Sequence, residues 1–158
     1  MKRESDGIVI IGIGNDYRRD DGVGIAAAAA LELLAIPNVV VKTGVADPMS
    51  LLETWTGASL VVIIDAAIAN PSTPGRIRRC ELHDVAAHTG GLHSHSIDIG
   101  RTHALGQALG RVPGELVMFS IEVAGTDHGI GLSPQVAGAV PKVVESVRAE
   151  INRALPVR

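Results

Sequence analysis

The sequence predicts an α/β fold: a single-domain three-layer sandwich in which a twisted, mostly parallel sheet of about five strands carries helices on both faces. Apolar runs of strand length alternate with helix-forming segments along the chain. The composition is 46% hydrophobic but only 2% aromatic, so Val, Ile, Leu and Ala must form the core. Such a core is typical of strands covered by Ala-rich helices. A length of 158 residues suits one domain over residues 1–158.

The first elements form a strand, a loop and a helix, followed by a second strand. The continuous apolar run at residues 8–14 predicts a buried parallel strand. Residues 22–35 are rich in Ala and Leu over enough length for a crossover helix. Three consecutive valines in residues 39–44 predict the second strand.

The middle of the chain adds a helix and two strands. Asp47 is expected to cap a helix, because Pro48 suits the first helical position. Residues 59–65 predict the most buried strand, which ends at an acid, Asp65. Residues 76–82 alternate Arg with apolar residues and predict a half-exposed edge strand.

The last part of the chain begins with a loop and returns to regular structure. Residues 83–96 are loop-like and hold four of the six histidines. Residues 97–110 have helical spacing, and residues 114–125 predict the last strand. Ser133 is the expected N-cap of a closing helix whose first position is Pro134.

Polar residues follow several of the predicted strands. Asp20 and Asp21 come after the first strand, Asp65 ends the third, and His93 and His95 precede a helix. Ligands of open parallel sheets bind beyond the carboxyl ends of the strands, where such segments converge. Two carboxylates and an imidazole suit a divalent first-row metal with positions open for water or substrate.

Each candidate also has an ordinary structural role open to it. One of Asp20 and Asp21 is expected to cap the helix that begins near Gly22, which leaves the other for the site. Asp65 could be a turn-forming residue after its strand, and His95 could be an exposed loop histidine. The remaining histidines have weaker support.

Composition and motifs argue against other functions. A net charge of -3 with dispersed basic residues argues against nucleic acid as a partner. Gly12 and Gly14 match two glycines of a dinucleotide-binding fingerprint, but Tyr17 occupies the third position and the adjacent acids would repel a pyrophosphate. Cys80, the single cysteine, is expected to be structural. With neither a signal peptide nor a membrane span recognisable, we expect a cytoplasmic protein.

The segment GIGNDYRRDDGVG, residues 12–24, resembles the N-terminal signature of the hydrogenase maturation proteases. These endopeptidases trim the C-terminus of the large subunit of [NiFe] hydrogenases. Residues 60–68 look like the family's strand with its second acidic ligand, and residues 94–96 are similar to its histidine loop. Residues 129–147 resemble its C-terminal helix entry, so the similarity runs from about Ile8 to Val147.

The resemblance implies that Asp21, Asp65 and His95 bind the metal, with His93 as the alternative imidazole because the loop's register is open. It implies that this metal is nickel supplied by the hydrogenase precursor, and that the enzyme is a monomer that forms a transient complex with it. Asp21 and Asp65 are then the catalytic candidates, one of them as general base. The alternatives are a nickel carrier that does not cleave its partner and, more remotely, a nucleotide-binding domain.

Overall fold

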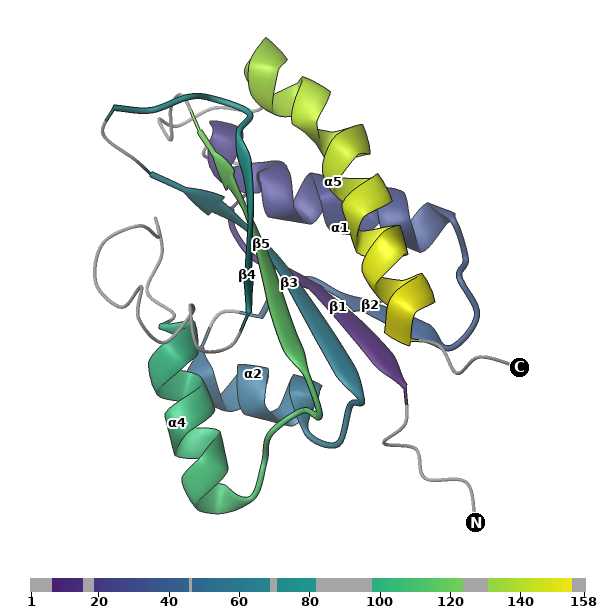
Figure 1. Ribbon diagram of the computed structural model, residues 1–158. Coiled ribbons are helices and arrows are strands. Elements are labelled where there is room, and N and C mark those ends of the chain that lie inside the picture. The colour runs from purple at the N-terminus through teal and green to yellow at the C-terminus, as the bar shows by residue number, and fades with distance from the viewer. Residues whose placement is uncertain are drawn as a thin grey trace.

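In the described part of the chain, a five-stranded sheet lies between two pairs of helices (Figure 1). The computed structural model describes residues 7–15, 19–45, 47–68, 71–81, 98–123 and 131–154. The strands are β1 (Ile8–Gly12), β2 (Val39–Lys42), β3 (Leu60–Ala67), β4 (Ile77–Glu81) and β5 (Leu116–Glu122). The helices are α1 (Val23–Leu33), α2 (Pro48–Trp55), α4 (Ile99–Leu109) and α5 (Pro134–Ala154), with a 3-10 turn η2 (Arg19–Gly22) before α1. The two pairs are α1 with α5 and α2 with α4.

The strands lie in the order β2-β1-β3-β5-β4. All neighbouring pairs are parallel except β4 with β5, which is antiparallel. Because β1 has β2 on one side and β3 on the other, the strand order reverses at β1, the kind of place where open α/β sheets bind ligands. The predicted α/β fold with a mostly parallel five-stranded sheet is confirmed.

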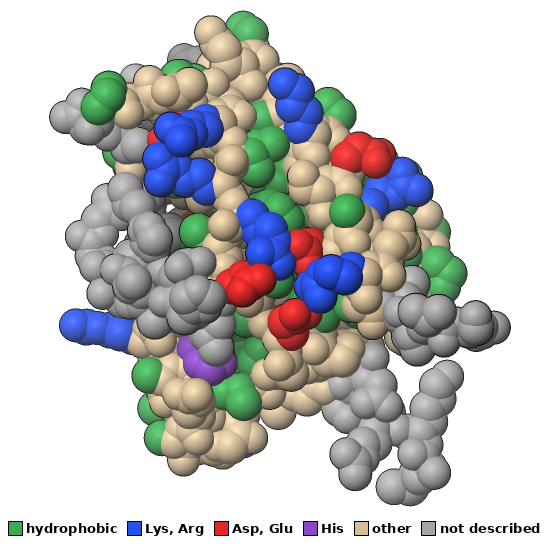
Figure 2. All heavy atoms as spheres, viewed as in Figure 1, with side chains coloured by type: hydrophobic (Ala, Val, Ile, Leu, Met, Phe, Trp, Pro, Cys, Tyr) green, Lys and Arg blue, Asp and Glu red, His purple; other side chains and the backbone are tan. Residues whose placement is uncertain are grey.

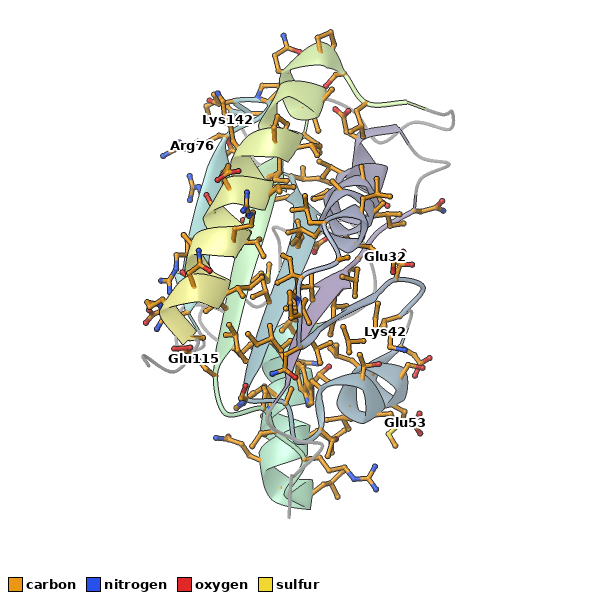
Figure 3. All side chains as sticks on the ribbon, turned by 90° about the vertical axis from the view of Figure 1, so that its right-hand side faces the viewer. Glu32, Lys42, Glu53, Arg76, Glu115 and Lys142 are labelled. Atoms are coloured by element: carbon orange, nitrogen blue, oxygen red, sulfur yellow. The ribbon has the colours of Figure 1, made fainter. Side chains whose placement is uncertain are left out.

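The two faces of the sheet have separate apolar cores. In β3, Leu60, Val62 and Ile64 pack with α1 and α5, whereas Val61 and Ile63 pack with α2 and α4. This alternation follows from the two-residue repeat of a strand. Some charged side chains of these elements point away from the cores: Figure 3 shows the exposed Glu32, Lys42 and Glu53 pointing outward from α1, β2 and α2.

The first turns of the helices confirm two predicted features. The Asp47 carboxylate accepts a hydrogen bond from the Ser50 backbone N–H at 2.9 Å, and Pro48 is the first residue of α2. Helix α4 begins in the same way, since Asp98 accepts from the Arg101 backbone N–H at 3.0 Å. Local side-chain chemistry therefore sets where these helices begin.

The edge strand β4 is half-exposed, as predicted, and ion pairs tie it to α5. Arg79 of β4 donates hydrogen bonds to Glu150 of α5 and to Glu81, while Arg153 donates to Glu150 and Glu115. Figure 2 shows these charges as interleaved blue and red side chains over β4 and α5. Burial raises the pKa of Glu150, but the hydrogen bonds from the two arginines outweigh it, so the pKa lies below its ordinary value.

Candidate active site

Close backbone packing holds the start of α1 against the carboxyl ends of β1 and β3. A Cβ added at Gly24 would lie 2.3 Å from the carbonyl oxygen of Ile64 and 2.5 Å from that of Ile13. The two strands are themselves joined there, since the Ile13 N–H donates to the Ile64 carbonyl at 3.0 Å. Only glycine permits this approach. The preceding turn η2 is thereby held beside the end of β3.

The loop after β1 closes on Asp21. Gly14 has φ of +140°, and a Cβ there would lie 2.0 Å from the Asp21 backbone oxygen. The Asn15 backbone N–H donates both to that oxygen, at 3.3 Å, and to Asp21 Oδ2, at 3.1 Å. Asp21 is only 2% exposed. The glycine-rich loop therefore serves to bury and orient a carboxylate.

The neighbouring Asp20 has a different task from the one predicted. Asp20 is 1% exposed, and its carboxylate accepts hydrogen bonds from the Ser133 N–H at 2.7 Å and the Ser133 hydroxyl at 2.9 Å. The N-cap of α1 is Gly22, which has no side chain to offer. The prediction that one of the two aspartates caps α1 is therefore wrong, because Asp20 instead joins η2 to the residue before α5.

Asp65 lies within β3 rather than at its end. The prediction that the strand stops at Asp65 is wrong because pairing with β5 continues through Ala66 and Ala67. The Asp65 side chain is fully buried, and its Oδ1 accepts from the Ala66 N–H at 2.8 Å. By the alternation of β3, this carboxylate is on the face that α2 and α4 cover.

The structure thus brings two of the three predicted ligands to the same end of the sheet. Asp21 belongs to η2, which contacts β3, and Asp65 belongs to β3 itself. The predicted third ligand, His95, and its alternative, His93, lie outside the described residues.

The donor chemistry of this pair fits a divalent cation. Both carboxylates are at least 98% buried, and buried carboxylates are costly unless they are hydrogen-bonded, paired or bound to a metal. Across the described segments, no three His, Cys, Asp or Glu side chains are grouped closely enough to hold a metal ion. A complete ligand set at Asp21 and Asp65 therefore needs a donor from beyond these segments.

Two polar residues of β5 at this end of the sheet were missed from the sequence. Ser120 is paired with Asp65, and Glu122, two residues further on, is on the same face. The buried Glu122 carboxylate accepts from the Thr73 N–H at 3.2 Å and lies 3.8 Å from the Arg78 guanidinium. The two-residue spacing of Ser and Glu at the end of an apolar strand was the available signal.

His103 and Cys80 pack against the apolar core formed with α2 and α4 or its aromatic ring, as structural residues do. His103 of α4 is 6% exposed and meets the Trp55 ring edge-on, with ring centroids 5.9 Å apart. Burial lowers the pKa of His103 below its ordinary value. Cys80 is partly buried against the core formed with α2 and α4, which agrees with the structural role expected for it.

Taken together, a sheet covered on both faces and two buried aspartates beside its reversal point define a doubly wound α/β protein with an acidic site. The chain belongs to the hydrogenase maturation protease family, because the family model HycI, hydrogenase maturation protease, matches residues 27–150. This protein is accordingly a hydrolase that acts on peptide bonds in hydrogenase maturation. The resemblance seen in the sequence is confirmed.

Individual relatives agree with this assignment. The hydrogenase 2 maturation protease of Escherichia coli K12 is 24% identical over 150 residues, which cover 93% of this chain and 92% of that protein. The hydrogenase expression/formation protein HupD of Thiocapsa roseopersicina is 27% identical over 148 residues, covering 90% of this chain and 66% of that one.

Solved structures share the fold. The hydrogenase maturating endopeptidase HybD from E. coli superposes with a TM-score of 0.83 at 23% identity, covering 94% of this chain and 93% of that one. HybD from Thermococcus kodakarensis gives a TM-score of 0.77 at 24% identity, covering 90% and 97%. In the described part of the chain, none of the helices combines the length and apolar character needed to cross a membrane.

Proposed function

We propose that this protein removes the C-terminal tail of a [NiFe] hydrogenase large-subunit precursor after nickel insertion, and that Asp21, Asp65 and His95 bind the precursor's nickel. The observation that supports this proposal is the burial of Asp21 and Asp65 at one end of the sheet, each held by a backbone N–H. In this proposal the enzyme is a cytoplasmic monomer and the complex with the precursor is transient.

The two carboxylates have the chemistry that peptide hydrolysis requires. An attacking water must lose a proton, and the leaving nitrogen must gain one; a positioned carboxylate can accept the first proton and return it. The Asn15 N–H and the Ala66 N–H fix Asp21 and Asp65 before substrate arrives. A divalent metal bound to such a site lowers the pKa of water and polarises a carbonyl. One aspartate is the general base, and both orient the precursor through its nickel.

The test is the intact mass of a nickel-loaded precursor after incubation with the protein. We expect the wild-type protein to release a short C-terminal tail from this precursor and to leave a nickel-free precursor intact. The variants Asp21→Ala, Asp65→Asn and His95→Ala should lose cleavage. Glu53→Gln, which changes an exposed acid on α2, is the matched control and should cleave normally. Normal cleavage by Asp65→Asn would contradict the proposed site.

The same experiment also distinguishes His93 from His95 as the imidazole ligand, and a protease from a nickel carrier. If His93→Ala rather than His95→Ala abolishes cleavage, His93 is the imidazole ligand. A stable complex whose precursor mass never changes would support the nickel carrier instead, although membership in a protease family favours cleavage.

A further inference from the structure

Ser120 of β5 is the direct neighbour of Asp65 in the sheet. The two residues are partners in the parallel pairing of β3 with β5. Adjacent strands are about 4.8 Å apart, and aligned residues of parallel strands present their side chains on the same face. That face is fixed by the neighbouring residues, because Met118 and Ile63 both belong to the core formed with α2 and α4.

The Ser120 hydroxyl is buried and has no hydrogen-bond partner among the residues that the structure describes. The residue is 7% exposed. Thr102, which is 3% exposed, shows the usual behaviour, since its hydroxyl donates to the Asp98 carbonyl at 2.8 Å. Buried polar side chains of native proteins are normally hydrogen-bonded, and exceptions call for an explanation.

The Ser120 hydroxyl adds a hydrogen-bond donor beside two aspartates that provide only acceptors. Ionised Asp21 and Asp65 can only accept hydrogen bonds, whereas the serine hydroxyl carries an O–H. A peptide substrate brings a carbonyl oxygen that gains negative charge when water adds to its carbon, and hydrogen-bond donors stabilise that charge. Among the side chains described beside Asp65, Ser120 is suited to this task and has no competing partner.

We infer that the Ser120 hydroxyl donates a hydrogen bond to the carbonyl of the precursor's scissile peptide bond when that bond is held beside Asp65. This inference rests on the proposed function, which places Asp65 in the cleavage site. Ser120 then contributes to the chemical step, not to the stability of the folded chain. Its replacement should therefore affect turnover while leaving thermal stability intact.

The experiment compares Ser120→Ala, which removes the hydroxyl, with Ser120→Thr, which retains it. Cleavage of nickel-loaded precursor is followed by mass, and kcat, KM and Tm are measured for each variant. We expect Ser120→Ala to lower kcat about 10- to 100-fold and to change KM less than about threefold, as for loss of a hydrogen bond to a developing charge. Its Tm should not fall, and Ser120→Thr should keep kcat within about threefold of the wild type.

The matched control is Ile121→Val, one residue along β5 but in the opposite core. It should lower Tm through the lost methylene and leave kcat unchanged below the melting range. If Ser120→Ala has the wild-type kcat, or if it loses activity only because its Tm is lower, the inference about Ser120 is wrong while the proposed function still stands. A wild-type protein that leaves the precursor intact overturns the proposed function and this inference with it.

Discussion

Gly24→Ala is the sharpest test of how the site is built. Ala is the better helix former, by up to about 1 kcal/mol, so helix propensity alone predicts a gain in stability. The structure predicts a loss, because the new Cβ would meet the Ile64 carbonyl at 2.3 Å, where ordinary contact begins at 3.4 Å. The atoms that the new Cβ would meet are backbone atoms, which cannot rotate out of the way as a side chain can. Helix α1 must therefore move by about 1 Å.

Overpacking of this kind costs about 3 kcal/mol when no flexible side chain can give way. Offset by the propensity gain, the net loss is about 2 kcal/mol, which lowers Tm by about 4–8 °C in a protein of this size. The displacement also moves η2 and Asp21 relative to β3, so cleavage should decline at temperatures where the variant is folded.

Gly138→Ala is the matched control, because Gly138 is a helical glycine of α5 whose added Cβ would meet nothing within 4 Å. It should raise Tm by about 2 °C through propensity alone. Both variants are measured by thermal unfolding followed by circular dichroism. A Gly24→Ala protein with a Tm equal to or above the wild type would refute the close-packing explanation.

Three further predictions concern buried polar groups. Asp20→Ala should lower the free energy of unfolding by about 2 kcal/mol, because it leaves the Ser133 N–H and hydroxyl without their acceptors; urea unfolding checks this, and an unchanged midpoint would contradict it. Glu150→Gln should cost about 1.5–3 kcal/mol at neutral pH through its weakened hydrogen bond with Arg79. Since the pKa of Glu150 is lowered from 4.5, its contribution is present above that pH and is lost as the pH falls through the folded-state pKa, so wild type and variant should converge in acid. Burial lowers the pKa of His103 below 6.5, so the unfolded chain binds a proton at this histidine more readily than the folded chain does. The free energy of unfolding should therefore fall as the pH drops below 6.5. His103→Phe should make Tm less dependent on pH in this range, which Tm measured against pH checks.

Local signals in the sequence were sufficient for most of the secondary structure. The apolar runs of β1 and β3 and the alternating β4 were predicted from their own residues, since burial on both faces or on one face sets each pattern. Asp47 and Pro48 predicted the start of α2 because capping depends on neighbours within one turn. Asp21 and Asp65 were predicted as site candidates because each follows an apolar run in the sequence, and the structure shows that both are buried, with Asp65 inside β3.

The partners of these groups were decided by the tertiary structure. One of Asp20 and Asp21 was expected to cap the next helix, but both carboxylate oxygens of Asp20 accept hydrogen bonds from Ser133, which lies far along the chain. Ser120 gave little signal in the sequence, and its position beside Asp65 exists because β3 and β5 pair in one particular register. A residue's type and its local spacing determine what it can donate, accept or cap. Which distant residue it meets depends on strand order and register, which are fixed when the whole core packs.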